Sequence, residues 1–473
     1  MINIMKNFVY SDIIYFEVFI MKRKKINIRP TQYILIGFFI IIIIGSVLLS
    51  MPISSADGVR VKYIDALFTA ATASCVTGLV TVPTFSTWST FGHVVILILI
   101  QIGGLGVVGV VSWFMSAAHR KAGLSEHIRI SEAFNLNTLS GLSAFVKKVV
   151  YGTFLVEGVG ALMYMPVFVR DFGLKGIWIA VFNSVSAFCN AGIDIIAPDS
   201  LSRYALNPLV NLTTCLLIVF GGIGYVVWWD FIRVFKIMRG QNRRRFFSRL
   251  TLHSKIALTA TAFLIFSGAL GFFIFEYDNP ETIGNFSLFG KIQASFFQSV
   301  TTRTAGFFTV NQKALTPSSS FLSLILMFIG GSPVGTAGGI KTVTAAVLVS
   351  TAFSVIKNKN STDVFNRKIA DVYIKKAAAV TCFSFITAFA SAVLLAFVSA
   401  GEPIDVIYET VSAAATVGLS RDFTPTLSVL GKIIVIMTMY FGRVGPVSFA
   451  VALTGRTKNS NSVKNPEEEI SVG

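Results

Sequence analysis

Four short segments of the chain carry residues whose types and spacing suit the binding of a cation by main-chain oxygens. Each segment ends in a glycine, and an aromatic residue stands ten positions earlier, with several Ser and Thr residues between them. Successive glycines are separated by 114, 114 and 112 positions. Glycine leaves room for close approach, and rings of carbonyl oxygens can replace the hydration shell of a monovalent cation. The four glycines are Gly78, Gly192, Gly306 and Gly418.

The two residues before each glycine complete the predicted ion-binding filter. None of these stretches contains Asp or Glu, whereas a filter for divalent cations would be expected to carry a ring of acids. For Asp194 and Asp422, which follow two of the segments, we weigh two interpretations equally: cation-concentrating acids at an outer mouth, or ordinary solvated loop acids. The predicted filter residues, besides the four glycines, are Val76, Thr77, Asn190, Ala191, Thr304, Ala305, Thr416 and Val417.

A further glycine-rich segment lies between two apolar stretches, at residues 330–341. Gly and Pro at this density cannot continue a straight helix. We therefore expect the last helix of the third unit to be broken here, as the single broken helix among the four units, inside a shielded cavity below the filter. The residues predicted to form this gate are Gly330, Gly331, Gly335, Gly338, Gly339 and Lys341.

Arg443 stands where the other three units carry the second glycine of a pair, at 103–104, 221–222 and 330–331. We expect it in the middle of a helix, where a charge is costly unless it faces a cavity or a partner. The functional interpretation is an electrostatic barrier and latch that acts with the gate segment. The alternative is an arginine that pairs structurally with backbone carbonyls at a helix break.

The elements that position these residues are predicted to lie in a membrane. The sequence is 53% hydrophobic and 13% charged, far more apolar than a soluble domain. The apolar stretch before each glycine has about 12 residues, too few to cross a bilayer, and a longer apolar helix follows. Irregular backbone at this depth survives only where it is buried or lines a wet cavity. We predict an all-α polytopic membrane protein with four pseudo-repeats of helix, re-entrant pore helix, filter loop and helix around a single central pore.

Charge distribution sets the predicted orientation. Hydrophilic segments alternate between basic and acidic along the chain, which places the basic set and both termini in the cytoplasm. The basic run at 243–245 is interpreted as an anchor near anionic lipid rather than a nucleic-acid patch. Met21 offers a second start, so translation of residues 1–20 is left open. The predicted organisation is a cytoplasmic segment 1–31, pore repeats 32–118, 145–231, 255–356 (with the gate) and 374–454, and a cytoplasmic tail 455–473.

Together these segments resemble the KtrB-like membrane subunits of the Trk/Ktr/HKT superfamily of potassium transporters, over residues 30–455. The stretch Ala-Thr-Val-Gly-Leu at 415–419 is similar to the core of potassium-channel filters, and Gly338–Lys341 match the end of the family's gating loop. In that superfamily glycine at all four filter positions goes with potassium preference, and Ser in the first filter with sodium preference. Gly78 therefore implies potassium. The lack of two extra N-terminal spans favours the Ktr branch.

The resemblance implies potassium uptake across the plasma membrane by channel-like permeation, as the ion-translocating subunit of a Ktr-type system and not as an enzyme. It also implies a homodimer, a cytosolic ring of RCK-type nucleotide-binding subunits, no covalently bound cofactor, and sodium as a candidate activator. Two alternatives stay open, a sodium or less selective monovalent cation transporter and a secondary transporter of another small solute. Glu157, within an apolar helix, is either a proton-coupling group or a lone acid with a polar neighbour.

Overall fold

The computed structural model describes residues 30–106, 109–110, 142–238 and 246–445. Residues 1–29 of the predicted N-terminal segment, the basic run at 243–245 and the tail at 455–473 lie outside these residues.

Four long apolar helices, one in each unit, form the outer part of the described molecule. Each contains 18 to 29 consecutive residues that are long and apolar enough to cross a membrane. Their outward side chains are large and apolar, as Phe263 (70% exposed) and Phe397 (89% exposed) illustrate. Helices that are hydrophobic on all sides need a surrounding that is itself apolar, so these faces suit lipid. The long helices are α2 (Pro30–Leu49), α8 (Leu142–Phe172), α13 (Leu252–Glu276) and α17 (Asp371–Val398).

A short, largely buried helix follows each long helix and packs against it. These short helices are α3 (Tyr63–Cys75), α9 (Lys175–Cys189), α14 (Leu288–Thr301) and α18 (Pro403–Ala415). After a loop, a second apolar helix begins in every unit at a Ser, Thr or Asn whose side chain accepts a hydrogen bond from a first-turn amide, the usual way to satisfy a helix start. These second helices are α5 (Thr90–Leu105), α10 (Pro208–Gly222), α15 (Pro317–Phe328) and α19 (Val429–Val444).

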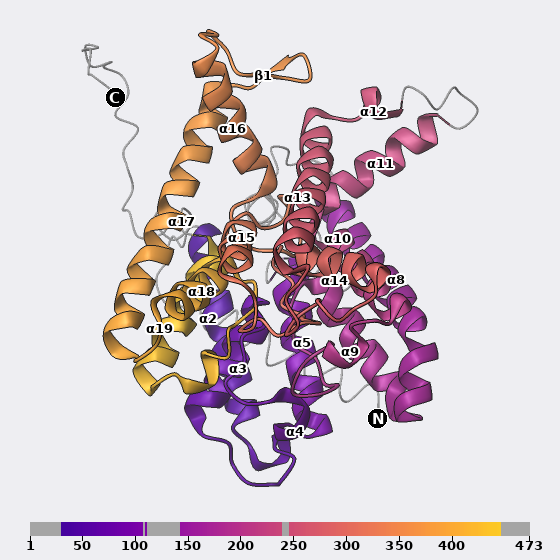
Figure 1. Ribbon diagram of the computed structural model, residues 1–473, viewed down its shortest axis with the longest axis vertical. Helices are drawn as coiled ribbons and strands as arrows, with labels where there is room; N and C mark the ends of the chain where they lie inside the picture. The colour runs from indigo at the N-terminus through magenta and orange to yellow at the C-terminus, as the bar shows by residue number, and fades with distance from the viewer. Residues whose placement is uncertain (1–29, 107–108, 111–141, 239–245, 446–473) are drawn as a thin grey trace, which may run out of the picture.

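The four units close into a ring. The second helix of each unit contacts the short helix of the next, in the pairs α5–α9, α10–α14 and α15–α18, and α19 of the fourth unit contacts α3 of the first. Segments far apart in sequence therefore lie side by side, as the indigo and yellow regions do in Figure 1. This order brings the loops after the four short helices towards one another.

The expectation of a single broken helix is wrong. The third unit is broken between α15 and α16 (Thr342–Ile356), but the second unit also bends, by 94°, between α10 and α11 (Tyr225–Ile237). In the first and fourth units, helices α5 and α19 end at Gly106 and Gly445, which have φ of 78° and 90°. A positive φ is a conformation that glycine adopts without strain. In every unit the described second helix thus stops or bends after 12 to 16 residues.

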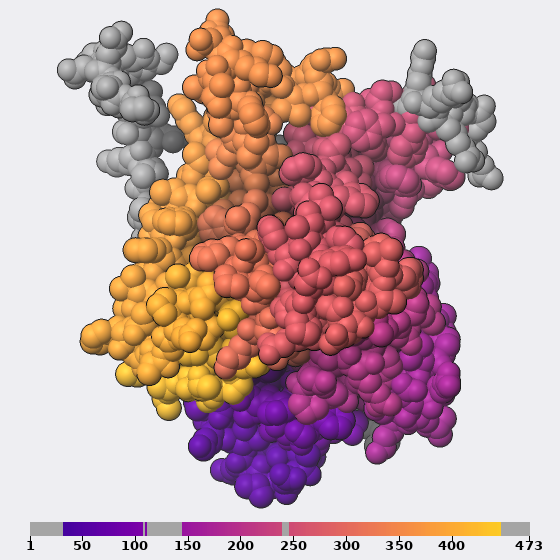
Figure 2. Space-filling view, viewed as in Figure 1, coloured from indigo at the N-terminus to yellow at the C-terminus, as the bar shows by residue number. Residues whose placement is uncertain are grey.

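Shorter elements connect the units. At one end of the molecule α11, α12 (Phe246–Arg249), α16 and a small hairpin project together (Figures 1 and 2). There the ring of Phe247 lies 5.7 Å from that of Phe365 in the hairpin, so two of the connections contact each other. The hairpin pairs β1 (Asp363–Val364) with β2 (Arg367–Lys368), and the remaining short elements are α4 (Thr84–Thr87), η1 (Pro52–Ser54), η2 (Ser202–Tyr204) and η4 (Thr424–Thr426).

Candidate ion-permeation site

The four glycines predicted as the filter lie together in the structure. A Cβ atom built onto Gly78 would lie 2.5 Å from the carbonyl oxygen of Ala191. The same atom would lie 3.2 Å from the Cα of Gly418 and 3.3 Å from that of Gly192. Contacts this short leave no space for a side chain at position 78, so close approach of the backbones requires glycine there.

The contacts around the four glycines follow the order of the units. Each glycine faces the carbonyl oxygen of the residue that precedes the glycine in the next unit. A Cβ on Gly306, for example, would lie 2.7 Å from the oxygen of Val417, and Gly418 of the fourth unit faces the oxygen of Thr77 in the first. The remaining contact joins Gly192 to the oxygen of Ala305. All four glycines have positive φ, between 64° and 103°. The main chains of four segments therefore surround one axis, with carbonyl groups from each.

The short helices end just before the glycines, and three of them end in the same way. In α3, α9 and α18 the residue after the helix is left-handed, with φ between 51° and 60°. In α3 the next amide, that of Thr77, donates to the carbonyl of Thr72, which is the hydrogen-bond pattern of a Schellman motif. Because the carbonyl ends of these helices point towards the glycines, their partial negative charge favours a cation there. The left-handed residues are Val76, Asn190 and Thr416.

Buried hydroxyl groups of the short helices accept hydrogen bonds from the backbone amides of the filter loops. The amide of Gly78 donates to Oγ1 of Thr72 (3.0 Å), and the amide of Gly418 donates to Oγ of Ser412 (3.0 Å). In the second unit Oγ of Ser186 accepts from the amide of Ile193 (3.1 Å). The Ser and Thr residues noted between each aromatic residue and its glycine thus have a geometric role, which is to fix the loop that follows.

The third unit departs from this pattern. Its short helix ends at Thr301, and the left-handed residue Thr304 (φ 64°) comes three positions later. The position equivalent to Thr72 is Val300, which has no hydroxyl, and Oγ1 of Thr301 instead donates to the carbonyl of Phe307. The third loop is therefore fixed by a different group on the same helix.

The predicted gate segment lies directly beneath this region and is held by backbone hydrogen bonds on several sides. Its own ends pair, with the amide of Gly330 donating to the carbonyl of Ile340 (2.9 Å). The amide of Ser332 donates to the carbonyl of Gly222 (2.7 Å), and the amide of Tyr225 donates to the carbonyl of Val334 (3.0 Å). The segment is thus docked against the break between α10 and α11, and several of its backbone groups have partners within the protein.

Arg443 contacts this segment, but it lies near the end of α19 and not in mid-helix as expected. Its Nη1 donates to the carbonyl of Thr336 in the gate segment (2.5 Å), and its Nη2 donates to the carbonyl of Gly103 at the end of α5 (2.5 Å). The helix stops here because Gly445 takes a positive φ. One guanidinium thereby joins the first, third and fourth units.

The other gate residues lie around the same point. Nζ of Lys341 donates to the carbonyl of Ala337 (2.6 Å), so the lysine closes the turn of its own segment. The amide of Gly338 donates to Oγ1 of Thr304 (3.2 Å). Gly339 has a φ of 65°, and a Cβ on Gly335 would lie 2.9 Å from the carbonyl oxygen of Gly221.

Sequence reasoning missed Arg303, which replaces the small residue found at the equivalent position in each other unit. Arg303 is 7% exposed, and its Nη2 donates to the carbonyl of Gly330 (3.1 Å). The difference is visible when the four segments are aligned on their glycines, because Arg303 then corresponds to Cys75, Cys189 and Ala415. A second positively charged side chain, after that of Arg443, therefore lies between the filter loops and the gate segment.

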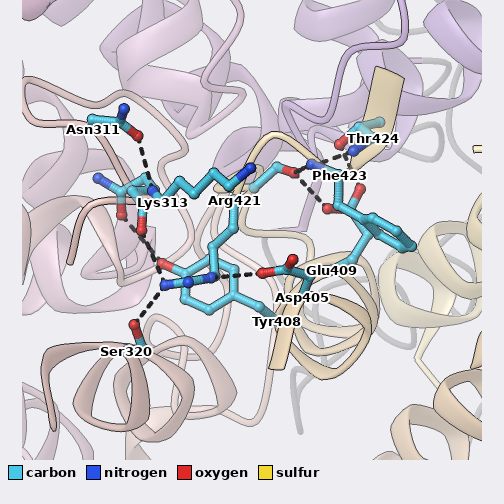
Figure 3. A network of polar contacts seen from close by, with 11 residues as sticks. Asn311, Lys313, Ser320, Asp405, Tyr408, Glu409, Arg421, Phe423 and Thr424 are labelled. Carbon is cyan, nitrogen blue, oxygen red and sulfur yellow. Dashed lines mark hydrogen bonds and ion pairs between the residues drawn. The ribbon is translucent and has the colours of Figure 1, made fainter. Parts of the chain in front are cut away.

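A polar network holds the loop that follows Gly418 (Figure 3). Arg421 forms an ion pair with Asp405 (Nε to Oδ1, 2.8 Å) and also donates to Oγ of Ser320 in the third unit (2.8 Å). The carboxylate of Glu409 is fully buried and accepts from the hydroxyls of Ser420 (2.6 Å) and Thr424 (2.5 Å). A buried network whose members all have partners favours one geometry for the loop.

Three acids singled out in the sequence have different surroundings. Asp194 is partly buried in the loop after the second filter segment, where its Oδ1 accepts from the amide of Ile196 (3.3 Å). Burial raises the pKa of Asp194 to about 6. Asp422 is exposed. Glu157 is 4% exposed and accepts from Nε2 of Gln101 (3.4 Å), so it has the polar neighbour that one of its two interpretations requires.

The TrkH family of cation transport proteins matches residues 2–463 of the chain. The chain belongs to this family. Its relatives include Ktr system potassium uptake protein B of Bacillus subtilis, 37% identical over 95% of this chain and 98% of the relative. Potassium/sodium uptake protein NtpJ of Enterococcus hirae is 35% identical over 96% and 99%. The resemblance to the Trk/Ktr/HKT superfamily is therefore confirmed.

The fold of this TrkH-family chain also has a counterpart among solved structures. The crystal structure of the potassium transporter TrkH from Vibrio parahaemolyticus matches with a TM-score of 0.72, over 92% of this chain and 87% of that one. At 15% identity this likeness concerns the fold alone. With the apolar helices it establishes an all-α membrane protein, as predicted.

Proposed function

We propose that this chain takes up potassium across the plasma membrane as the ion-translocating subunit of a Ktr-type system, with both termini in the cytoplasm. The observation that carries the proposal is the closed ring of Gly78, Gly192, Gly306 and Gly418 with a neighbouring carbonyl at each contact. Backbone oxygens converging from four loops provide a site where a monovalent cation can exchange its hydration shell. Relatives named as potassium uptake proteins support the choice of ion.

The gate belongs to the same proposal. The 330–341 segment lies beneath the ring, and the guanidinium of Arg443 is fixed against it by two carbonyl groups. A fixed positive charge on the permeation axis opposes cations electrostatically, and release of the segment would remove both the obstruction and the anchor of that charge.

A second candidate function is transport of sodium, or of monovalent cations with little discrimination. It is supported by the relative named as a potassium/sodium uptake protein, which is 35% identical over nearly the whole chain. The two candidate functions use the same filter and gate residues. They differ in how closely the filter oxygens must surround the ion.

The proposal includes assembly with a further component. Several relatives are named as proteins of a Ktr system, which supports partnership with a further component. From the family resemblance we also infer a cytosolic ring of RCK-type subunits, a homodimer of this chain and sodium as an activator. Contact with anionic lipid is inferred from the basic run at 243–245.

The test is growth of a strain without its own potassium uptake systems, at limiting potassium, with wild type and Gly78→Ser. Wild type is expected to restore growth, and Gly78→Ser is expected to admit sodium when ion fluxes are measured in liposomes. Gly58→Ser is the matched control, because Gly58 also has a positive φ (68°) but has nothing within 4 Å of its Cβ position. No growth with wild type would refute potassium uptake, and unaltered selectivity in Gly78→Ser would refute the filter.

A further inference from the structure

The gate segment is bonded to the filter itself, and Thr336 carries most of the connection. Its amide donates to the carbonyl of Gly221 (3.1 Å), and its own carbonyl accepts from Arg443. Its Oγ1 lies 3.0 Å from the carbonyl oxygen of Phe188 and 3.2 Å from Oδ1 of Asn190. Every polar atom of Thr336 therefore has a protein partner, and the residue is only 1% exposed.

Both acceptors of this hydroxyl belong to the second filter segment. Phe188 is in the last turn of α9, and Asn190 is the left-handed residue that turns the chain into the filter. The residue after Asn190 is Ala191, whose carbonyl oxygen meets Gly78 in the ring. A shift of Asn190 would consequently move one of the oxygens that line the axis.

A second connection reaches the third filter segment. The amide of Gly338 donates to Oγ1 of Thr304 (3.2 Å), and Thr304 is the left-handed residue of its own loop. In the first unit the equivalent left-handed residue is Val76, whose side chain has no group that could form such a bond. The gate segment thus holds the filter through specific repeats and not through all four alike.

We propose that Thr336 is a selectivity-determining positioning residue: by holding Asn190, it sets the position of the filter oxygens in the second unit. The inference rests on the proposed function of the ring as a filter. The bonds from Thr336 to Asn190 and from Gly338 to Thr304 hold the filter loops during the basal flux that passes while the gate segment stays docked. Loss of either bond loosens the filter, so discrimination between cations in this flux depends on the gate segment.

The test compares Thr336→Val with Thr336→Ser, in liposomes, by potassium uptake at rising sodium concentration. Valine keeps the shape of threonine but removes the hydroxyl, and serine keeps the hydroxyl. Thr336→Val is expected to lower the preference for potassium over sodium about fivefold, the factor that corresponds to one hydrogen bond. Thr336→Ser is expected to keep the wild-type ratio.

Two further variants complete the design. Ser332→Ala is a control within the same segment, because Oγ of Ser332 lies 2.8 Å from that of Thr342 and not against the filter; it is expected to change total flux without changing the ratio. Thr304→Val removes the second connection, and Val76 shows that this chain accepts valine at the equivalent left-handed position. It is expected to lower the ratio as Thr336→Val does, and it decides the question if Thr336→Val does not fold.

The outcomes separate this inference from the proposed function. Unchanged ion ratios in Thr336→Val and Thr304→Val, with altered total flux, would show a gate without influence on selectivity and would overturn the inference alone. Equal changes in Thr336→Val and Thr336→Ser would assign the effect to packing and overturn it as well. Absence of potassium transport by wild type would instead refute the proposed function.

Discussion

Nη1 of Arg443 lies 2.5 Å from the carbonyl oxygen of Thr336, and Nη2 lies equally close to that of Gly103. The planar guanidinium carries several donors in a fixed fork, so one side chain can bridge two backbones that belong to different units. The two interpretations of Arg443, as a charged barrier and as a partner of backbone carbonyls, therefore describe the same contacts. They make different predictions when charge and geometry are changed separately.

Replacement of Arg443 by Gln, or deletion within residues 333–338, is expected to raise basal potassium flux. Arg443→Gln removes the charge and at least one of two charge-assisted bonds, each of which contributes about 1.5–3 kcal/mol. An increase of at least about tenfold is expected, measured as efflux from potassium-loaded liposomes without any partner protein. Unchanged flux in both variants would refute the assignment of the gate.

Arg443→Lys separates the two contributions of this residue. Lysine keeps the charge but offers it as a point on a flexible stem, without the planar fork. If the charge alone blocks permeation, Arg443→Lys retains low basal flux. If the bridge between Thr336 and Gly103 holds the segment closed, its flux rises towards that of Arg443→Gln.

Two adjacent glycines in α10 test how the gate segment is docked. A Cβ on Gly221 would collide with the carbonyl oxygen of Phe188 and lie 2.8 Å from Oγ1 of Thr336. A Cβ on Gly222 would meet its nearest neighbour at 3.5 Å, which is ordinary contact. Gly221→Ala is therefore expected to disturb the gate and raise basal flux several-fold, whereas Gly222→Ala is expected to behave as wild type in the same assay. Equal behaviour of the two variants would argue against docking at this surface.

Sequence patterns predicted the parts of the site that repeat and missed the parts that depend on neighbours. The position of Gly78 and its equivalents followed from their spacing, because only glycine fits where four backbones meet. The break between α15 and α16 followed from the Gly and Pro content of the gate segment. The bend at Gly224 was not predicted, although a Cβ there would contact the carbonyl oxygen of Pro333; that partner lies more than a hundred residues away in sequence.

The hydrogen-bond partners of the buried arginines could not be predicted from the sequence either. The identity of Arg443 indicated a partner, but nothing in its surroundings named Thr336 or Gly103. Arg303 could have been noticed, because an arginine among the small residues just before a filter glycine is costly without a partner. Such contacts depend on how the units close into a ring, and the residues of one unit do not determine that arrangement.

Closure of the ring between the fourth and first units includes a buried ion pair, and its removal is expected to destabilise the protein. Nζ of Lys432 in α19 lies 2.6 Å from Oδ1 of Asp65 in α3, with side-chain exposures of 13% and 8%. Removing one partner of a buried pair leaves an uncompensated charge, at a cost of about 3–5 kcal/mol. Lys432→Met is expected to lower the thermal unfolding temperature of the detergent-solubilised protein markedly.

A double variant and a surface pair are the controls for this effect. Lys432→Met combined with Asp65→Asn removes both charges and is expected to recover much of the lost stability. The pair of Arg203 and Asp171 is longer (4.0 Å) and more exposed, so Arg203→Ala is expected to cost less than about 1 kcal/mol. Similar unfolding temperatures for Lys432→Met and Arg203→Ala would contradict a role of the buried pair in closing the ring.

The pH dependence of uptake distinguishes the two interpretations of Asp194. Because burial raises its pKa to about 6, the carboxyl is ionised at neutral pH and becomes neutral as the outer pH falls through that value. A negative charge near the filter mouth concentrates cations, and its loss is expected to raise the KM for potassium about two- to fivefold, the scale of one charge at short range near water. The measurement is potassium uptake by cells at outer pH between about 7.5 and 5.

Asp194→Asn is expected to show the low-pH KM throughout, while Asp422→Asn, which changes an exposed acid, is expected to keep the wild-type profile. The same profile in Asp194→Asn as in wild type would make Asp194 an ordinary loop acid.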